Sequence, residues 1–177
     1  MDWSNINIRG NFILKKISFK GKYYSQIEIE FNIDNDIYNL IYDMDDKCCE
    51  DYGVFFKISG VKYLIDSITK EKYITSKEPI IYTNTSSTPV PIPINFRIEY
   101  ETYDYDDDIF DYNNATYDHE NNTYDYTGAA GNSFKFMFIT RKNKNIFPLK
   151  CYNNHNGYYS HDISLSKNSV EIFRSSL

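Results

Sequence analysis

The sequence predicts a mainly β, antiparallel fold, either a single sheet or a sandwich of short strands, with α+β character only at the margin. Runs in which apolar and polar residues alternate recur along the chain, as expected for strands that bury one face. Tyr, Phe and Ile favour strands and are abundant, whereas Ala, the best helix former, is rare. At 177 residues, the chain is long enough to bury a core of its own. We therefore expect residues 1–177 to form one β-rich domain.

The first third of the chain contains the clearest alternation. In residues 26–33 every second residue is Ile or Phe, and the residues between them are polar. Polar turns such as Asp34-Asn35-Asp36 separate this run from its neighbours. Short connections of this kind favour antiparallel pairing of consecutive strands. The strands predicted in this region are residues 12–20, 26–33, 37–44 and 52–58.

One stretch follows a helical period instead. Val61, Leu64, Ile65 and Ile68 are spaced as i, i+3, i+4 and i+7, which places them on one face of a helix. This spacing predicts a short helix near residues 61–69 that covers one side of a sheet. The alternative is a strand rich in Tyr and Ile that matches the helical spacing by chance.

Residues 84–132 are expected to be an insertion. Residues 84–95 contain Pro89, Pro91 and Pro93 in alternation with other residues. Proline cannot donate a ladder hydrogen bond, so residues 84–95 are expected to be a linker or an edge rather than a central strand. Residues 97–105 could continue as a strand, and residues 80–82 could form a short one before the insertion. Residues 106–131 are low in complexity and rich in Asp, Asn and Tyr.

The last third predicts two further strands, residues 134–140 and 146–152, joined by a polar loop. The Asn156-Gly157 pair then opens into an alternating run, with Tyr159, His161, Ile163 and Leu165 on one face. Asn-Gly tolerates the positive φ of a tight turn, so this pair predicts a hairpin. Residues 168–177 carry no clear signal and are left without an assigned structure.

The acidic residues gather in one segment. Residues 99–125 contain ten acidic residues and no Lys or Arg, with seven Tyr between residues 100 and 126, whereas the rest of the chain is mildly basic. Self-repulsion favours an extended, solvated loop, and tyrosine suits contact surfaces. We expect this loop to dock on a protein partner with a basic surface. Direct binding of nucleic acid is not expected, because phosphate would be repelled. Its acidic interaction residues are Glu99, Glu101, Asp104, Asp106, Asp107, Asp108 and Asp111.

Several classes of protein are disfavoured by composition. No apolar run approaches the ~20 residues of a membrane span, and residues 1–10 lack the apolar core of a signal peptide. Three cysteines, two of them adjacent, fit a reduced compartment better than a disulfide framework. We expect an intracellular protein, without membrane association, secretion or a cofactor.

No catalytic or metal-binding constellation is complete. Cys48 and Cys49 are adjacent, so on a strand they point to opposite faces and do not both bind one metal. The acidic residues around them do not follow the calcium-loop spacing. A pair of Cys151 with His161 or His155 lacks an oxyanion motif. We therefore assign no catalytic residue and no metal site, and we expect His161 to be a hydrogen-bonded core residue.

Two clusters resemble the signature of an uncharacterised family of small proteins found in bacteriophages and large DNA viruses. They are Asp46-Lys47-Cys48-Cys49-Glu50, and Tyr152 followed by Asn156-Gly157-Tyr158-Tyr159-Ser160. The resemblance covers residues 23–82 and 133–165. The chain differs from the family pattern at Lys47 (Asp in the family), Cys151 (Trp) and His161 (acidic). The resemblance implies a viral source and a compact β-rich fold, but no established reaction. The binding residues that it implies are Asp46, Cys48, Cys49, Glu50, Tyr152, Asn156, Tyr158, Tyr159 and Ser160, and we expect the two clusters to lie close together.

These observations predict a viral, non-enzymatic interaction or structural protein, such as a virion component, that presents a Tyr-rich acidic loop to a protein partner. Two alternatives remain open. One is an inhibitor whose acidic loop imitates nucleic acid toward a host protein. The other is a small enzyme that uses the Cys48 and Cys49 region. The oligomeric state and the identity of the partner are not predicted.

Overall fold

The strands predicted from sequence alternation dominate the computed structural model, which describes residues 5–20, 25–45, 51–66, 69–70, 80–103, 117–118, 123–124, 131–154 and 160–177. The mainly β, antiparallel prediction is confirmed. The strands are β1 (Asn7–Lys20), β2 (Gln26–Ile33), β3 (Asp36–Asp43), β4 (Asp51–Ile58), β5 (Val61–Asp66), β6 (Ile80–Thr83), β7 (Ile92–Tyr103), β8 (Tyr117–Asp118), β9 (Thr123–Tyr124), β10 (Gly131–Thr140), β11 (Leu149–Asn154), β12 (Asp162–Lys167) and β13 (Val170–Ser176).

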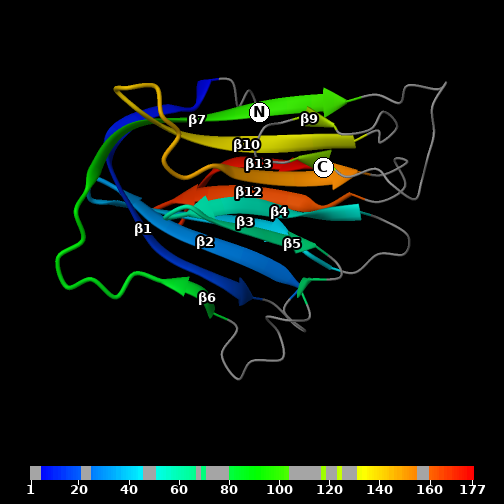
Figure 1. Cartoon of the computed structure of the whole chain (residues 1–177), viewed down its shortest axis with the longest axis horizontal. Coiled ribbons are helices and arrows are strands. Elements are labelled where there is room, and N and C mark those ends of the chain that lie inside the picture. Colours follow the sequence, from blue (N-terminus) through cyan, green and yellow to red (C-terminus); the bar gives the residue numbers. More distant parts are fainter. Residues whose placement is uncertain are drawn as a thin grey trace.

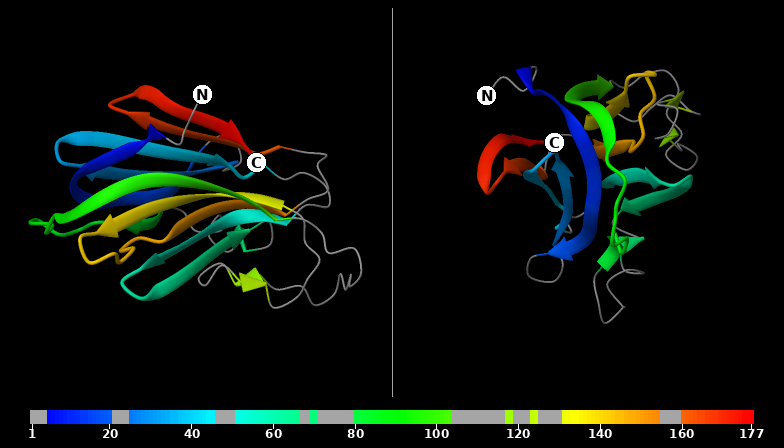
Figure 2. Two further views of the ribbon diagram at one scale, coloured as in Figure 1. Left: turned by 90° about the horizontal axis from the view of Figure 1, so that it is seen from above. Right: turned by 90° about the vertical axis from the view of Figure 1, so that its left-hand side faces the viewer.

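The described strands, apart from β8 and β9, form one open sheet of 11 strands that folds over on itself (Figure 1). Its order is β13-β12-β3-β2-β1-β7-β10-β11-β4-β5, and β6 pairs with β1 outside this path. Seen from the side, β13, β12, β3 and β2 form one layer, and β7, β10, β11, β4 and β5 form the layer facing it (Figure 2). The sheet therefore has the architecture of a sandwich.

Strand β1 connects the two layers. Its first half pairs with β7 and its second half with β2 and β6. The register with β2 shifts between Leu14 and Lys16, and such a bulge bends a strand and increases its twist. Asn84 supports the bend, because its backbone N–H donates to the Lys15 carbonyl and its side-chain amide donates to the Leu14 carbonyl. The chain thus turns from one layer to the other without leaving the sheet.

The core between the layers is largely aromatic. Phe31 of β2 is fully buried, and its ring centroid lies 5.8 Å from that of Phe96 and 5.2 Å from that of Phe138, on the opposite layer. Phe173 of β13 likewise meets Phe134 of β10, with 5.2 Å between the centroids. Edge-to-face and tilted arrangements of this kind are favoured by the ring quadrupoles. The alternating Phe residues predicted for residues 134–140 therefore do face the core.

The predicted helix near residues 61–69 is wrong where the chain is described, because residues 61–66 form strand β5. Ser59 and Gly60 both have positive φ, and Ile58 pairs with Val61, so these residues make a two-residue hairpin turn. The turn returns the chain along β4. Among the described residues of the supposed helical face, Ile65 is buried, whereas Val61 and Leu64 are exposed.

The prediction that residues 84–95 form a linker or an edge is wrong only for the last residues of this stretch, because residues 84–91 lie outside the strands. Strand β7 starts at Ile92, contains Pro93, and lies between β1 and β10. Pro93 is tolerated because the pairing with β10 ends at Ile94, so Pro93 has a strand on one side only. The range 84–132 therefore contains a central strand. The described residues between β7 and β10 form a separate two-stranded sheet, β8 and β9.

The predicted Asn156-Gly157 hairpin does not form between the strands that flank it. Strand β11 pairs with β10 and β4, whereas β12 pairs with β3 and β13 in the other layer. The connection between them therefore passes from one layer to the other; Asn156 and Gly157 themselves lie outside the described residues. Both neighbouring positions of β11 are already filled, which leaves no edge for a returning strand.

The unassigned tail forms strand β13. Asn168 and Ser169 have positive φ, and Lys167 pairs with Val170, so the tail returns along β12 through a two-residue turn. The side chain of Asn168 accepts a hydrogen bond from the Ile37 N–H and donates one to Asp36. These bonds tie the turn to β3. The tail thus completes the edge of the first layer.

Candidate functional site

The described residues that flank the two clusters singled out by the family resemblance lie at one end of the sandwich. Asp46, Cys48, Cys49, Glu50, Asn156, Tyr158 and Tyr159 lie outside the described residues. The residues that flank them are neighbours, because Asp51 pairs with Asn154 and the His161 imidazole Nδ1 lies 3.1 Å from the Asp43 carbonyl oxygen. Ser160 is exposed at this end, whereas Tyr152 is buried. The closeness of the clusters themselves stays a prediction.

The core next to this end contains polar side chains, including His161 and Tyr42, which we call the buried polar layer. His161 is fully buried and stacks on Tyr52, with 4.0 Å between the ring centroids. The Tyr42 hydroxyl donates to the Tyr152 carbonyl at 2.7 Å, which joins β3 to β11 across the sandwich. Burial raises the pKa of Tyr42 well above its ordinary value. The layer therefore ties the two halves of the sheet together, and His161 occupies the core position expected from the sequence.

The side chains of the buried polar layer are poorly placed for catalysis or metal binding. Cys151 is fully buried, and burial raises the pKa of its thiol, whereas a nucleophilic cysteine needs a lowered pKa and access. A Cβ at Gly53 would lie 2.7 Å from the Tyr152 hydroxyl, so the Tyr152 ring is packed closely on β4. Within the described ranges, no group of three or more His, Cys, Asp or Glu could hold a metal ion.

The first acidic residues of the predicted interaction loop belong to the sheet. Glu99 and Glu101 lie in strand β7 rather than in a loop, and both are paired with basic side chains. Arg97 Nη2 lies 2.7 Å from Glu99 Oε1, and Lys135 Nζ lies 2.9 Å from Glu101 Oε2. Asp104, Asp106, Asp107, Asp108 and Asp111 lie outside the described residues.

Lys150 is an unusual basic residue beside this pair. Its side chain is only 3% exposed, and its Nζ lies 3.8 Å from Glu101 Oε2. Desolvation lowers the pKa of Lys150 to about 7, although the Glu101 carboxylate acts in the opposite direction. The charge of Lys150 is therefore costly to keep in the folded protein near neutral pH.

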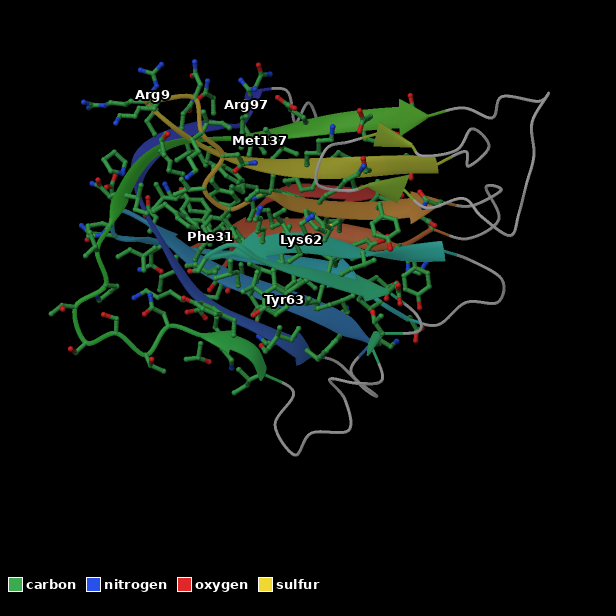
Figure 3. All side chains as sticks on the ribbon, viewed as in Figure 1. Arg9, Phe31, Lys62, Tyr63, Arg97 and Met137 are labelled. Carbon is green, nitrogen blue, oxygen red and sulfur yellow. The ribbon has the colours of Figure 1, made fainter. Side chains whose placement is uncertain are left out.

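The sequence interpretation missed a basic groove of about 530 Å³ on the outer face of β1, β7 and β10. We call it the arginine groove, because three of the four arginines of the chain line it. Arg9 and Arg97 lie close together at one corner of the molecule (Figure 3). The polar residues that line the arginine groove are Arg9, Asn11, Asn95, Arg97, Thr140, Arg141 and Asn143, with Asp34 as the acidic member.

Strand register explains why these arginines meet. Ile8, Phe96 and Phe138 occupy one row across the three strands, and the Phe side chains are buried in the core. The adjacent rows therefore point outward, and they hold Arg9 beside Asn95 and Arg97 beside Met137. The alternation of polar and apolar residues around Arg9 and Arg97 was the signal available in the sequence. Nothing local indicates that these residues share a surface.

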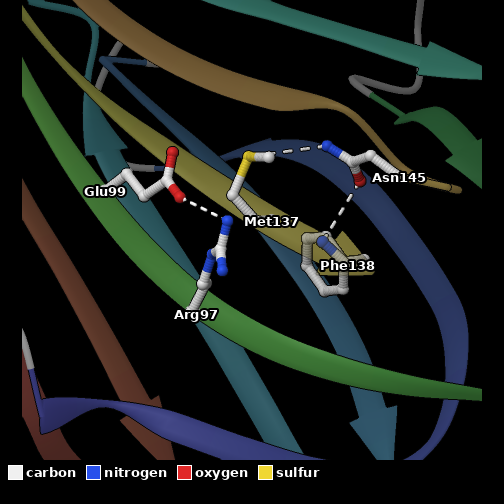
Figure 4. Close-up of polar contacts among 5 residues, drawn as sticks. All are labelled: Arg97, Glu99, Met137, Phe138 and Asn145. Atoms are coloured by element: carbon white, nitrogen blue, oxygen red, sulfur yellow. Dashed lines mark hydrogen bonds and ion pairs between the residues drawn. The ribbon is translucent and has the colours of Figure 1, made fainter. Parts of the chain in front are cut away.

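The loop that carries Arg141 is fixed by hydrogen bonds. The Asn145 side chain accepts from the Phe138 N–H at 3.1 Å and donates to the Met137 sulfur at 3.6 Å (Figure 4). The Thr140 N–H donates to the Lys144 carbonyl at 2.9 Å, which closes the loop. Arg141 is therefore presented from a braced turn at the rim of the arginine groove.

The arginine groove carries unneutralised positive charge. Arg9 and Arg141 are exposed, and within the described part of the chain neither guanidinium has an ion-pair or hydrogen-bond partner. Arg97 is half exposed and forms an ion pair with Glu99. Guanidinium groups bind carboxylate or phosphate through two parallel hydrogen bonds and stack on aromatic rings. The chemistry of the groove therefore suits an anionic ligand.

Comparisons with protein-family models, curated proteins and solved structures found no match. Among the described residues, no helix is both long enough and apolar enough to cross a membrane. The proposed function therefore rests on the sequence and the geometry of this chain.

Proposed function

We propose that the protein is a viral, non-enzymatic interaction or structural protein, such as a virion component, that presents its Tyr-rich acidic segment to a protein partner with a basic surface. The acidic segment is defined here as residues 104–125. The observation that carries this proposal is the β-hairpin on which the segment is mounted.

Strands β7 and β10 pair without interruption from Ile94 and Thr140 to Tyr103 and Gly131. They are central strands, and the β10 side chains Phe134 and Phe136 are fully buried. The residues that contain the segment, 104–130, therefore leave and re-enter a rigid base at the paired residues Tyr103 and Gly131. A rigid base favours binding, because fewer degrees of freedom are lost when the partner docks.

The charge balance supports the same proposal. Glu99 and Glu101 are neutralised on the sheet by Arg97 and Lys135, whereas the acidic segment itself contains eight carboxylates and neither Lys nor Arg. Its tyrosines add large apolar surfaces with a polar tip. A basic protein surface would satisfy both the carboxylates and the aromatic rings.

The buried groups argue against a nucleophilic pair of Cys151 and His161, whereas Cys48 and Cys49 of the enzyme alternative lie outside the described residues. Cys151 and His161 are the cysteine and histidine that the structure describes, and both are fully buried. The His161 ring stacks on Tyr52, and its Nδ1 contacts a backbone carbonyl. Neither group is presented to a substrate.

Deletion of residues 104–125, closed with a short Gly-Ser linker, is expected to leave the fold intact. The flanking pair Tyr103 and Gly131 keeps its register, and the shorter loop should raise the free energy of unfolding by up to about 1 kcal/mol. Binding to an immobilised Arg-rich peptide should be lost at low salt. Urea denaturation and a binding series in salt would measure the two effects.

Two matched variants separate charge from aromatic contact. One replaces every Asp and Glu of the acidic segment by Asn and Gln, and the other replaces its tyrosines by Ser while keeping all charges. Both should bind the peptide more weakly than the wild type. Unchanged binding after the deletion would contradict the proposed function, and a loss of folding would show that the segment belongs to the core.

A further inference from the structure

We infer that the arginine groove receives the acidic segment of a second copy of this chain, so that copies associate head to tail. This inference rests on the proposed function, because it names the basic surface on which the segment docks. Charge, composition and position favour the acidic segment as the occupant of the arginine groove.

Charge and composition are complementary. The arginine groove presents the guanidiniums of Arg9 and Arg141 without internal partners among the described residues, and Arg97 half exposed beside them. The acidic segment offers Asp and Tyr in close alternation, for example Asp104-Tyr105-Asp106 at its start. Arginine pairs with carboxylates through its planar fork and stacks on tyrosine rings. Both side-chain types of the segment therefore have a counterpart in the groove.

Position makes the association head to tail. The arginine groove lies at the first half of β7, and the acidic segment begins after Tyr103 at the other end of the same strand. Tyr103 follows Arg97 by six positions, which corresponds to about 20 Å along a strand. The donor and acceptor surfaces are thus at opposite ends of one element. Contacts between two different surfaces of identical chains are heterologous and can propagate into rings or filaments, as a structural protein requires.

The arginine groove is open in the single chain. Arg9, Arg97 and Arg141 are all exposed, so they remain accessible to a second copy. Nucleic acid fits the whole molecule less well, because the net charge is −6 and the acidic residues repel phosphate. An acidic protein segment that carries its own aromatic rings suits a groove in a chain of this charge.

The test uses full-length chain and two complementary variants. One is the groove variant Arg9→Ser/Arg97→Ser/Arg141→Ser, and the other is the deletion of residues 104–125. Sedimentation velocity over a concentration series at low salt should show self-association of the wild type, weakened at least about tenfold in each variant. Mixing the two variants should restore a 1:1 complex, because one keeps the segment and the other keeps the groove. High salt should dissociate it.

Controls keep the outcome interpretable. Arg174→Ser removes the fourth arginine, which is exposed and paired with Glu171 on β13, and it should associate as the wild type does. The double variant Arg9→Ser/Arg141→Ser keeps the Arg97–Glu99 pair and should also weaken association, with unchanged circular dichroism.

Three results would overturn the inference: no association of the wild type, full association of the groove variants, or a mixture that stays monomeric. Binding of a 20-nucleotide single-stranded RNA that needs the groove arginines, without self-association, would assign the groove to nucleic acid instead. If the deletion abolishes peptide binding while the groove variants associate normally, the proposed function stands and only this inference fails.

Discussion

Replacing Phe31 by alanine is expected to lower the free energy of unfolding by about 3–5 kcal/mol, the range for a large core aromatic. Phe31 is fully buried in β2. Its ring centroid lies 5.8 Å from Phe12, 5.3 Å from Tyr38, 5.8 Å from Phe96 and 5.2 Å from Phe138. These neighbours belong to both layers of the sandwich. Alanine would leave a cavity at the position where the two layers meet, and the surrounding rings could close it only in part.

Urea denaturation of wild type, Phe31→Ala and Phe31→Leu would measure the effect. Leucine keeps most of the apolar volume, so Phe31→Leu should lose about 1–2 kcal/mol. Val170→Ala, at a position that is 66% exposed, is the surface control and should stay within about 0.5 kcal/mol of the wild type. A loss below about 1 kcal/mol for Phe31→Ala would mean that the layers do not depend on this contact.

Lys150→Met is expected to stabilise the protein by about 1–4 kcal/mol at neutral pH. Burial lowers the pKa of Lys150 to about 7, from 10.5. Each pKa unit corresponds to about 1.4 kcal/mol, which sets an upper bound of about 5 kcal/mol on the cost of charging this group in the folded state. Methionine keeps the apolar stem and removes the charge. Glu101 keeps Lys135 as its partner.

The sign of the pH dependence follows from the lowered pKa. Between pH 7 and 10.5 the unfolded chain keeps the proton on Lys150 and the folded chain releases it, so wild-type stability from this group rises with pH. Below pH 7 both states are protonated and the full cost is present. The difference between Lys150→Met and wild type should therefore be largest below pH 7 and shrink toward pH 9.

Denaturation at pH 6, 7, 8 and 9 would follow this difference. Lys135→Met is the matched control, because Lys135 pairs with the same carboxylate but its side chain is 20% exposed against 3% for Lys150. It should give no comparable gain. A difference that does not change with pH would show that Lys150 is not deprotonated on folding.

The sequence by itself determined the strands in which apolar and polar residues alternate. Alternation over residues 26–33 and 134–140 predicted β2 and β10, and the alternating face of His161, Ile163 and Leu165 is the buried face of β12 and the residue before it. Alternation is a local property, because successive side chains of any strand point to opposite faces. It identified which residues are buried without knowledge of their partners.

Local sequence patterns led to wrong predictions where one pattern is compatible with two structures. Val61, Leu64 and Ile65 match a helix, yet the positive φ of Ser59 and Gly60 makes a hairpin turn and the segment pairs with β4 as a strand. Asn156-Gly157 has the residues of a tight turn, but β11 was already paired on both sides. In both cases the outcome depended on which strand edges were free.

Only the tertiary structure decided which residues, distant in the sequence, share a surface. Arg9, Arg97 and Arg141 are far apart in the sequence, and they meet because β1, β7 and β10 are neighbours in one sheet. Glu99 and Glu101 were expected to be part of a free acidic loop, but Glu99 pairs with Arg97 of its own strand, and Lys135 of β10 and Lys150 of β11 lie beside Glu101. The contacts of Glu101 arise from strand pairing between distant residues, and no pattern within a single strand encodes its neighbour.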